Sequence, residues 1–122
     1  MKELKEHSFS ELLAKNSNVL AWKLDANFVF TYISSFVHKA IGYETDEIVG
    51  KYMLSFVTPE SKDHILDQWE QRISKNELNK IIILAVQFTC KNGNKILVEV
   101  LVESIYNGNR IVGYNAILKD KY

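Results

Sequence analysis

The side chains with the most chemistry to offer are three histidines, one cysteine and two glutamates in the C-terminal third. A metal site needs inward-facing ligands at a defined spacing on one element. At about 100° of rotation per helical residue, His64 lies opposite the apolar stripe of its predicted helix and His38 lies on the polar side of its own. His7 precedes the first predicted helix. We therefore expect all three to be solvated, and no metal site is predicted.

Cys90, Glu99 and Glu103 do not form a recognisable catalytic group. A reactive thiol needs nearby positive charge, and Lys91 alone supplies little, so Cys90 is interpreted as structural. Glu99 and Glu103 share a face of a predicted strand with Lys95, which is typical of a solvated sheet surface. No Ser/His/Asp grouping or glycine-rich phosphate loop is present. Catalysis by this region is not predicted.

The remaining candidates for function are aromatic and apolar. Phe30 and Tyr32 share a face of one predicted strand, and helices expected to cover that face supply Phe36, Met53, Phe56 and Trp69. Such a lining suits a small, mainly apolar ligand with few polar contacts. The polar contacts could come from Tyr32, Gln87, Thr89 and Asn115, depending on which parity of each strand faces inward. The same side chains could instead simply fill the core.

Composition limits the other function classes. The 122 residues suffice for one domain, and 15 basic side chains balance 15 acidic ones. A nucleic-acid interface is therefore not expected, because it would need a basic excess. No apolar run approaches the roughly 20 residues of a membrane helix. The single cysteine suits a reducing compartment, so the cytoplasm is the expected location, and the chain could be an excised module of a longer protein.

The sequence also predicts the helices and strands that position these side chains. Ser8 and Glu11 predict a capped amphipathic helix over 8–16. Strands are expected over 19–24 and 28–33, followed by a short helix capped by Ser34 or Ser35 and ended by Gly42, and by a turn that Thr45 caps. Thr58-Pro59 predicts a helix to about residue 74, with Ile65, Leu66, Trp69 and Ile73 as its apolar stripe.

The last third of the chain predicts three long strands, over 80–90, 95–106 and 110–119. They are separated by Asn92-Gly93 and Asn107-Gly108, dipeptides suited to tight hairpin turns. The order predicts an α+β fold: one five-stranded antiparallel sheet with helices inserted between strands two and three, plus the N-terminal amphipathic helix. We expect residues 1–17 to be a connector helix and 18–120 to be the domain.

The strand over 95–106 is apolar on both faces, so its outer face needs a cover. Leu97 and Leu101 lie on one face and can be covered by the predicted helix 8–16, through Phe9, Leu12 and Leu13. That helix could come from the same chain or from a second copy. The second arrangement would be a homodimer contact that carries a signal.

The chain resembles the PAS sensor domain over residues 17–120. The resemblance is carried by short strings in the family's order: Leu24-Asp25, Tyr32-Ile33-Ser34, 41–51 with its Gly-Tyr and Glu-Ile-Val-Gly pieces, 56–60, 91–95, 98–100, 111–114 and 118–120. Two positions depart from the family pattern. Ser34 stands where asparagine is frequent, and Phe28 stands where glycine is common in the first hairpin.

The resemblance implies a non-catalytic, cytoplasmic input module of a signal-transduction protein. Such a module binds a small ligand in its core cavity or contacts a partner, and biases an output domain such as a two-component histidine kinase or a GGDEF diguanylate cyclase. The family's cofactors fit poorly. Met53 stands where flavin-binding light sensors need a cysteine, Leu118 stands where they use glutamine, and haem binding needs an inward histidine. The competing interpretation is a constitutive homodimerisation scaffold with a filled core.

Overall fold

The structure is a computed structural model that describes residues 19–74 and 81–118. The predicted helix over 8–16 lies outside the described residues. The described elements are β1 (Ala21–Asp25), β2 (Phe30–Ile33), α2 (Val37–Ile41), two short 3₁₀ helices (Thr45–Glu47 and Met53–Phe56), α3 (Pro59–Ser74), β3 (Ile82–Thr89), β4 (Lys95–Asn107) and β5 (Arg110–Leu118).

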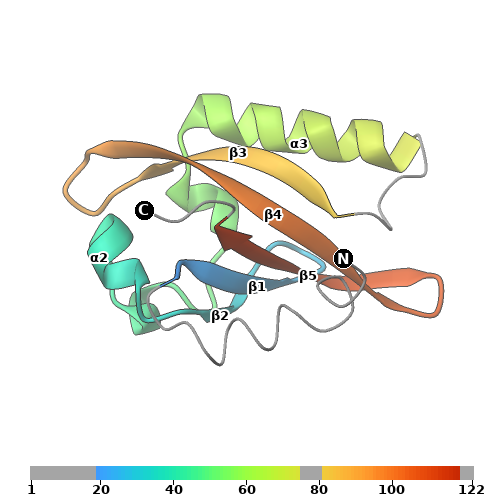
Figure 1. The fold of residues 1–122 in the computed structure, drawn as a ribbon, viewed down its shortest axis with the longest axis horizontal. Helices are drawn as coiled ribbons and strands as arrows, with labels where there is room; N and C mark the ends of the chain where they lie inside the picture. Colours follow the sequence, from blue (N-terminus) through green and yellow to red (C-terminus); the bar gives the residue numbers. More distant parts are fainter. Residues whose placement is uncertain (1–18, 75–80, 119–122) are drawn as a thin grey trace.

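The strands form one five-stranded sheet in the order β2-β1-β5-β4-β3, and each neighbouring pair is antiparallel. The two sequence-separated β blocks meet at the β1–β5 ladder, where Trp22 pairs with Ala116. The helical segment between β2 and β3 lies over one face of the sheet (Figure 1). The predicted α+β arrangement of the sheet and its inserted helices is confirmed.

Glycine conformations explain how the two C-terminal hairpins close. Gly93 and Gly108 have φ angles of 93° and 68°, in the left-handed region that glycine adopts without penalty. Both Asn-Gly turn predictions are therefore confirmed. Gly113 is required for another reason, because a Cβ atom there would lie 2.5 Å from the carbonyl oxygen of Leu24 on β1.

Two predicted helix caps are wrong. The residue before α2 is Phe36, with no side-chain cap. The Ser34 hydroxyl instead donates to the carbonyl of Val19 at 2.6 Å and accepts from the Ala21 amide at 3.2 Å, so it joins the end of β2 to β1. The turn at 45–47 is capped by Glu44 and Glu47 through a reciprocal pair of hydrogen bonds.

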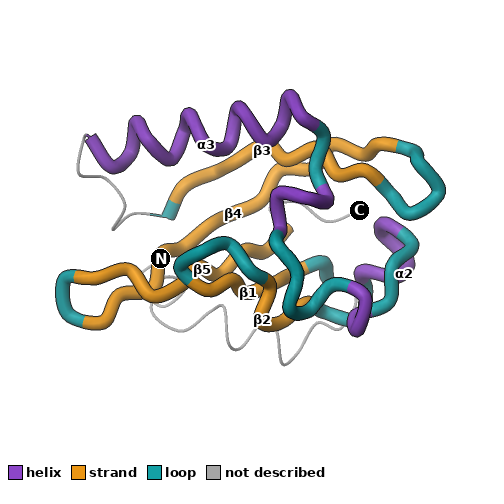
Figure 2. Tube along the Cα trace, turned by 180° about the vertical axis from the view of Figure 1, so that it is seen from behind, coloured by secondary structure: helices purple, strands orange, loops and turns teal. Residues whose placement is uncertain are grey.

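Helix α3 begins at Pro59 as predicted and lies along the edge strand β3 (Figure 2). The Thr58 hydroxyl accepts from the Ser61 amide and donates to Gln87 of β3, and the Ser61 hydroxyl accepts from the Gln87 amide. Ile65 and Trp69 are buried on the face below. Leu66 is a correction to the predicted stripe, because it is 40% exposed. A helix that packs on an edge strand buries a narrow stripe, and Leu66 lies about 100° from Ile65.

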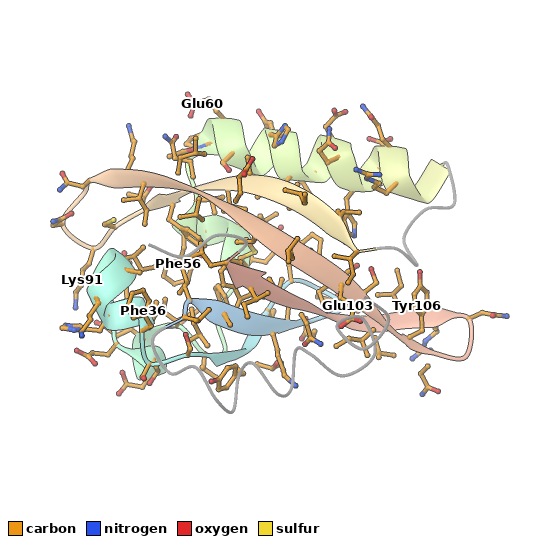
Figure 3. The ribbon with its side chains drawn as sticks, viewed as in Figure 1. Phe36, Phe56, Glu60, Lys91, Glu103 and Tyr106 are labelled. Carbon is orange, nitrogen blue, oxygen red and sulfur yellow. The ribbon has the colours of Figure 1, made fainter. Side chains whose placement is uncertain are left out.

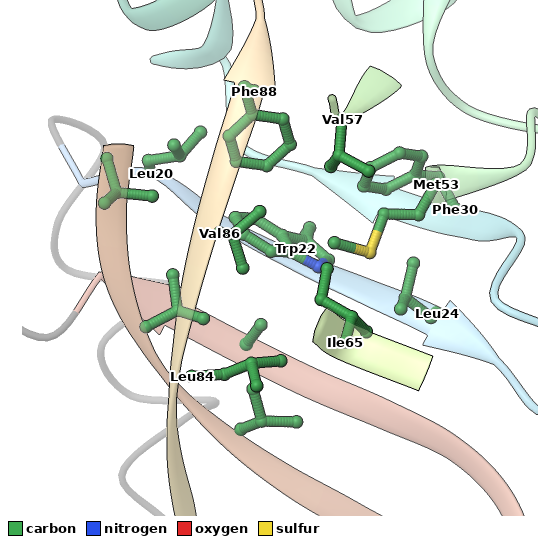
Figure 4. Close-up of a cluster of buried hydrophobic side chains, with 14 of the residues drawn as sticks. Leu20, Trp22, Leu24, Phe30, Met53, Val57, Ile65, Leu84, Val86 and Phe88 are labelled. Carbon is green, nitrogen blue, oxygen red and sulfur yellow. The ribbon is translucent and has the colours of Figure 1, made fainter. Parts of the chain in front are cut away.

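Alternate strand residues form the core on the helix-covered, inner face of the sheet. Trp22 lies at the centre of this core. Its ring centroid is 5.5 Å from that of Phe88 and 6.2 Å from that of Phe30, and both ring pairs are edge-to-face. Figure 4 shows Trp22 among Val86, Met53 and Ile65. One register row, Trp22–Ala116–Val102–Ile82, faces inward, and the next row, Ala21–Ile117–Leu101–Ile83, faces outward. This parity decides which side chains reach the interior.

Candidate functional site

An apolar cavity lies between the inner face of the sheet and α3. Its volume is about 30 Å³. Thirteen residues line it: Trp22, Leu24, Phe28, Met53, Leu54, Ile65, Trp69, Leu84, Val86, Val100, Val102, Tyr114 and Ala116. Pockets that hold drug-sized ligands usually measure about 300–1,000 Å³. In this conformation the cavity has room for a water-sized group.

Three aromatic side chains from separate elements form one end of the cavity. The ring centroid of Phe28 lies 6.2 Å from that of Trp69 and 5.3 Å from that of Tyr114. The Trp69 and Tyr114 rings are 5.1 Å apart, and the indole Nε1–H donates to the Tyr114 hydroxyl at 3.1 Å. This hydrogen bond joins two of the lining residues, and the surface that the wall presents to the cavity is apolar.

Burial sets the charge state of the Tyr114 hydroxyl. Removal from water raises its pKa above the ordinary value, and the hydrogen bond from Trp69 opposes this only in part. The hydroxyl is therefore neutral at physiological pH. A neutral phenol and an indole suit an uncharged ligand better than an ion.

The backbone holds Phe28 in an unusual conformation. Its φ angle is 65°, and it is the one non-glycine residue with positive φ in the described part of the chain. The Phe28 amide donates to the Asp25 carbonyl at 3.1 Å, and the Phe28 carbonyl accepts from the Met53 amide at 2.8 Å. The Asp25 carboxylate also accepts from the amides of Asn27 and Val29. The turn is thus fixed by hydrogen bonds at a cost of about 1–2 kcal/mol in backbone strain.

The structure brings Met53 and Trp69, of the side chains predicted from the sequence, to the cavity. Phe30 is buried beside Trp22 but does not line the cavity. Phe56 packs on Phe30 at 6.0 Å between ring centroids. Phe36 is half-buried against the core near α2, at the same end of the molecule as Phe56 (Figure 3). These three support the interior and do not form its cavity wall.

Tyr32, Gln87 and Asn115 are corrections to the predicted lining. Tyr32 is 38% exposed and pairs with Lys23 of the outward-facing set. The Asn115 amide lies within 3.4 Å of a Glu103 carboxylate oxygen on the same outer face. The Gln87 side-chain oxygen accepts a hydrogen bond from the Thr58 hydroxyl. Gln87 and Asn115 have the outward phase of their strands. Tyr32 is two residues from the buried Phe30, and the register shift between Lys23 and Leu24 in the β1–β2 ladder turns it outward.

The sequence reasoning missed Phe28 and Tyr114 as wall residues. Tyr114 shares strand parity with Ala116, and Ala116 pairs with the core residue Trp22. A consistent inward phase for β5 would therefore have selected Tyr114 in place of Asn115. Phe28 was signalled by its position where a glycine is common, because that position requires a positive φ angle.

The outer face of the sheet presents a second candidate surface. Leu97 is 66% exposed and Ile83 is 52% exposed, whereas Ala21 and Ile117 are buried with Val19 and Leu101 packed against them. The predicted contact residues Phe9, Leu12 and Leu13 lie outside the described residues. Leu97 and Leu101, whose spacing puts them on one face of β4, lie on the outer face.

Charged groups gather where α2 meets the β3–β4 hairpin. The Lys91 ammonium lies 2.7 Å from a Glu47 carboxylate oxygen, and the Lys91 amide donates to the Ile41 carbonyl. His38 lies 3.2 Å from Glu44 and is exposed, as is His64, so the solvated interpretation of these two histidines is confirmed. Cys90 is a buried free thiol. Among the residues described, no group of three potential ligands could hold a metal ion.

None of the described helices is both long enough and apolar enough to span a bilayer.

No protein-family model matches the sequence, and no curated protein gives a significant match. Solved structures do match. A PAS domain from a two-component sensor histidine kinase aligns with a TM-score of 0.68 at 17% identity, over 99% of this chain and 100% of that chain. The PAS domain of an HTR-like protein from Haloarcula marismortui aligns with a TM-score of 0.68 at 20% identity, over 98% of this chain and 96% of that chain.

A third match comes from the N-terminal domain of a diguanylate cyclase with a PAS/PAC sensor from Marinobacter aquaeolei. Its TM-score is 0.66 at 12% identity, over 84% of this chain and 94% of that chain. The sheet order and the inserted helices agree with these alignments, which cover 84–99% of this chain. The chain has the PAS fold.

Proposed function

We propose that this chain is a sensory input module of a signal-transduction protein and that it binds a small molecule in its inner cavity. The observation that carries the proposal is the apolar cavity over the inner sheet face, which has the Trp69–Tyr114 hydrogen bond within its wall. Apolar pockets with a few fixed polar groups are typical small-molecule sites. The PAS domains of a histidine kinase and a diguanylate cyclase among the matched structures support a signalling role.

The module works without catalysis of its own. Tyr114 is the one titratable side chain in the described cavity wall, and it has no acid or base beside it there. General acid–base chemistry needs such a partner within hydrogen-bond reach. The ligand therefore acts by shifting a conformational equilibrium that an attached output domain detects. That output is a histidine kinase or a diguanylate cyclase, and residues 18–120 are the sensing unit with 1–17 as connector.

The free thiol of Cys90 supports a reducing environment, so we place the module in the cytoplasm. The described part of this chain lacks the residues that hold flavin or haem in the sensors that bind those cofactors. Met53 cannot form a thiolate adduct, and neither His38 nor His64 faces the interior. A diffusible metabolite is the expected ligand class.

A thermal-shift screen tests the proposal. Small neutral molecules that bind the folded wild-type chain raise its unfolding temperature, because ligation favours the folded state. Ala116 lines the cavity, so Ala116→Leu fills the space and abolishes these shifts, and Ala116→Val reduces them with less strain. Ala26→Leu, at an exposed turn position, is the matched control. Shifts that persist in both Ala116 variants would contradict binding at this site.

A second function is favoured by the exposed outer face. The small cavity volume and the exposed Leu97 and Ile83 side chains suit a homodimerisation scaffold with a filled core. In that case the chain forms a dimer through the sheet whether or not ligand is present. Light scattering at several concentrations distinguishes the two, because the scaffold predicts a dimer and no thermal shift with any compound.

A further inference from the structure

We infer that the Phe28 side chain is the gate of the inner cavity, and that the molecule it admits is small, neutral and carries a hydrogen-bond acceptor for the Tyr114 hydroxyl. The inference rests on the proposed function and deepens it.

Phe28 is the residue of the cavity wall that is most exposed to solvent. Twelve of the thirteen lining residues are buried, and Phe28 is the one that is only partly buried. A ligand that enters by any other part of the described wall would have to displace a buried side chain. Entry past Phe28 costs the contacts of one ring with Trp69 and Tyr114. Such aromatic contacts are worth about 0.5–1.5 kcal/mol each.

The backbone around Phe28 stays in place while the side chain moves. The amide and carbonyl of Phe28 are both hydrogen-bonded, and the Asp25 carboxylate holds the amides on either side of it. The positive φ angle is therefore imposed by the turn. A rotation of the side chain opens the cavity without disturbing β1 or β2.

The volume that the ring leaves behind is what makes the site large enough. With Phe28 in this position the cavity volume of about 30 Å³ is too small for an organic ligand. Outward rotation adds the space of a phenyl ring next to this void. Apolar cavities of about 150 Å³ accept benzene-sized molecules. The admitted ligand is therefore of the size of a single ring or a short branched chain.

Tyr114 supplies the polar contact once Phe28 has rotated, because with Phe28 in place the wall presents only apolar surface to the cavity. The Tyr114 hydroxyl oxygen accepts from Trp69, and no hydrogen bond described for this residue uses its own proton. A buried hydroxyl with a free proton donates to any acceptor placed beside it, and a ligand that lacks an acceptor leaves that proton unsatisfied. Because the described wall carries no cationic group, the acceptor belongs to an uncharged carbonyl, ether or hydroxyl.

The test uses acetophenone, which has a carbonyl acceptor, and α-methylstyrene, which has nearly the same shape without it. Binding is followed by the NMR shift of the Trp69 indole N–H. Phe28→Gly removes the gate and relieves the positive φ angle, and we expect it to bind acetophenone about tenfold more tightly than the wild-type chain. Phe28→Ala serves as the second variant. Phe56→Leu is the control, since Phe56 is half-buried against the core but does not line the cavity.

In the wild-type chain, saturation with acetophenone is expected to shift the ring signals of Phe28. In Phe28→Gly, acetophenone is expected to bind about fivefold more tightly than α-methylstyrene, and Tyr114→Phe removes that preference. Unchanged affinity in both Phe28 variants, or wild-type binding with unmoved Phe28 signals, overturns the gate. Equal affinity for the two probes overturns the acceptor class. Thermal-shift hits on the wild type with no effect at Phe28 refute only this inference, whereas a lack of any hit refutes the sensor function itself.

Discussion

Tyr114 combines packing, hydrogen bonding and ionisation at one residue. Its ring contacts Phe28 and Trp69, and its hydroxyl accepts the indole proton. Burial raises the pKa of that hydroxyl because the phenolate would lose its hydration. The folded state therefore favours the protonated form more strongly than the unfolded chain does, which makes stability depend on pH at alkaline values.

We predict that Tyr114 makes the wild-type chain less stable at alkaline pH. The unfolded chain ionises Tyr114 near the ordinary pKa of 10.0, whereas the folded chain ionises it at higher pH. The stability that the protonated Tyr114 hydroxyl contributes is fully present below pH 10.0, the unfolded-state pKa. It is lost as the pH rises through the higher folded-state pKa. Tyr114→Phe should therefore lose less stability than the wild type between neutral and strongly alkaline pH. Urea unfolding at a series of pH values measures this.

Tyr52 offers the comparison for that experiment, since its side chain is exposed and outside the cavity. Tyr52→Phe should keep the alkaline profile of the wild type. A Tyr114→Phe profile that parallels the wild type would show that the hydroxyl is not desolvated in solution.

At the scale of elements, the β1–β5 ladder joins the two halves of the sheet, and Gly113 permits their close approach. A methyl group there would lie 2.5 Å from the Leu24 carbonyl oxygen. We predict that Gly113→Ala lowers the free energy of unfolding by about 1–3 kcal/mol, the usual cost of overpacking. Asn109→Ala, at an exposed position in the β4–β5 hairpin, should change it by no more than about 0.5 kcal/mol. Equal stability of Gly113→Ala and the wild type in urea would contradict this close contact.

The α2 region is joined to the β3–β4 hairpin by the Glu47–Lys91 ion pair. The hydrogen bond from Lys91 holds the pKa of Glu47 below its ordinary value of 4.5. The stabilisation that the Glu47–Lys91 pair gives is present above the ordinary pKa of 4.5. It is lost as the pH falls through the lower folded-state pKa of Glu47. Glu47→Gln should therefore flatten the acidic side of the stability profile, and added salt should weaken the wild-type effect. Asp63→Asn, at an exposed position on α3, is the control, and identical profiles for Glu47→Gln and the wild type would refute the pairing.

The order of elements could be predicted from the sequence because its signals are local. Asn92-Gly93 and Asn107-Gly108 have the turn chemistry that hairpins need, and Pro59 marks the start of α3. Strand parity could not be predicted in the same way. β4 is apolar on both faces, so its alternation does not identify the inner one, and Asn115 was assigned to the wrong side. The conformation of Phe28 depends on hydrogen bonds to Asp25 and Met53, of which Met53 is distant in sequence.

At the scale of the whole molecule, the outer sheet face decides whether two copies associate. Leu97 and Ile83 are the most exposed large apolar side chains of the described sheet. If this face forms the homodimer, Leu97→Glu and Ile83→Glu should each shift the dimer toward monomer by tenfold or more, roughly the loss expected when a charge enters an apolar contact. Analytical ultracentrifugation measures the dissociation constant. Val49→Glu replaces an exposed apolar residue outside the strands and should leave the dissociation constant unchanged.

The central claim is that the PAS fold of this chain encloses a site for a small neutral molecule. Native mass spectrometry of the freshly purified chain tests it most directly, because it weighs the folded protein together with what it binds. We predict a species heavier than the polypeptide by the mass of one small organic compound per chain, and its loss in Ala116→Leu. Bare protein mass in every charge state, unchanged after incubation with cell-extract metabolites, would contradict the claim and leave a filled-core scaffold.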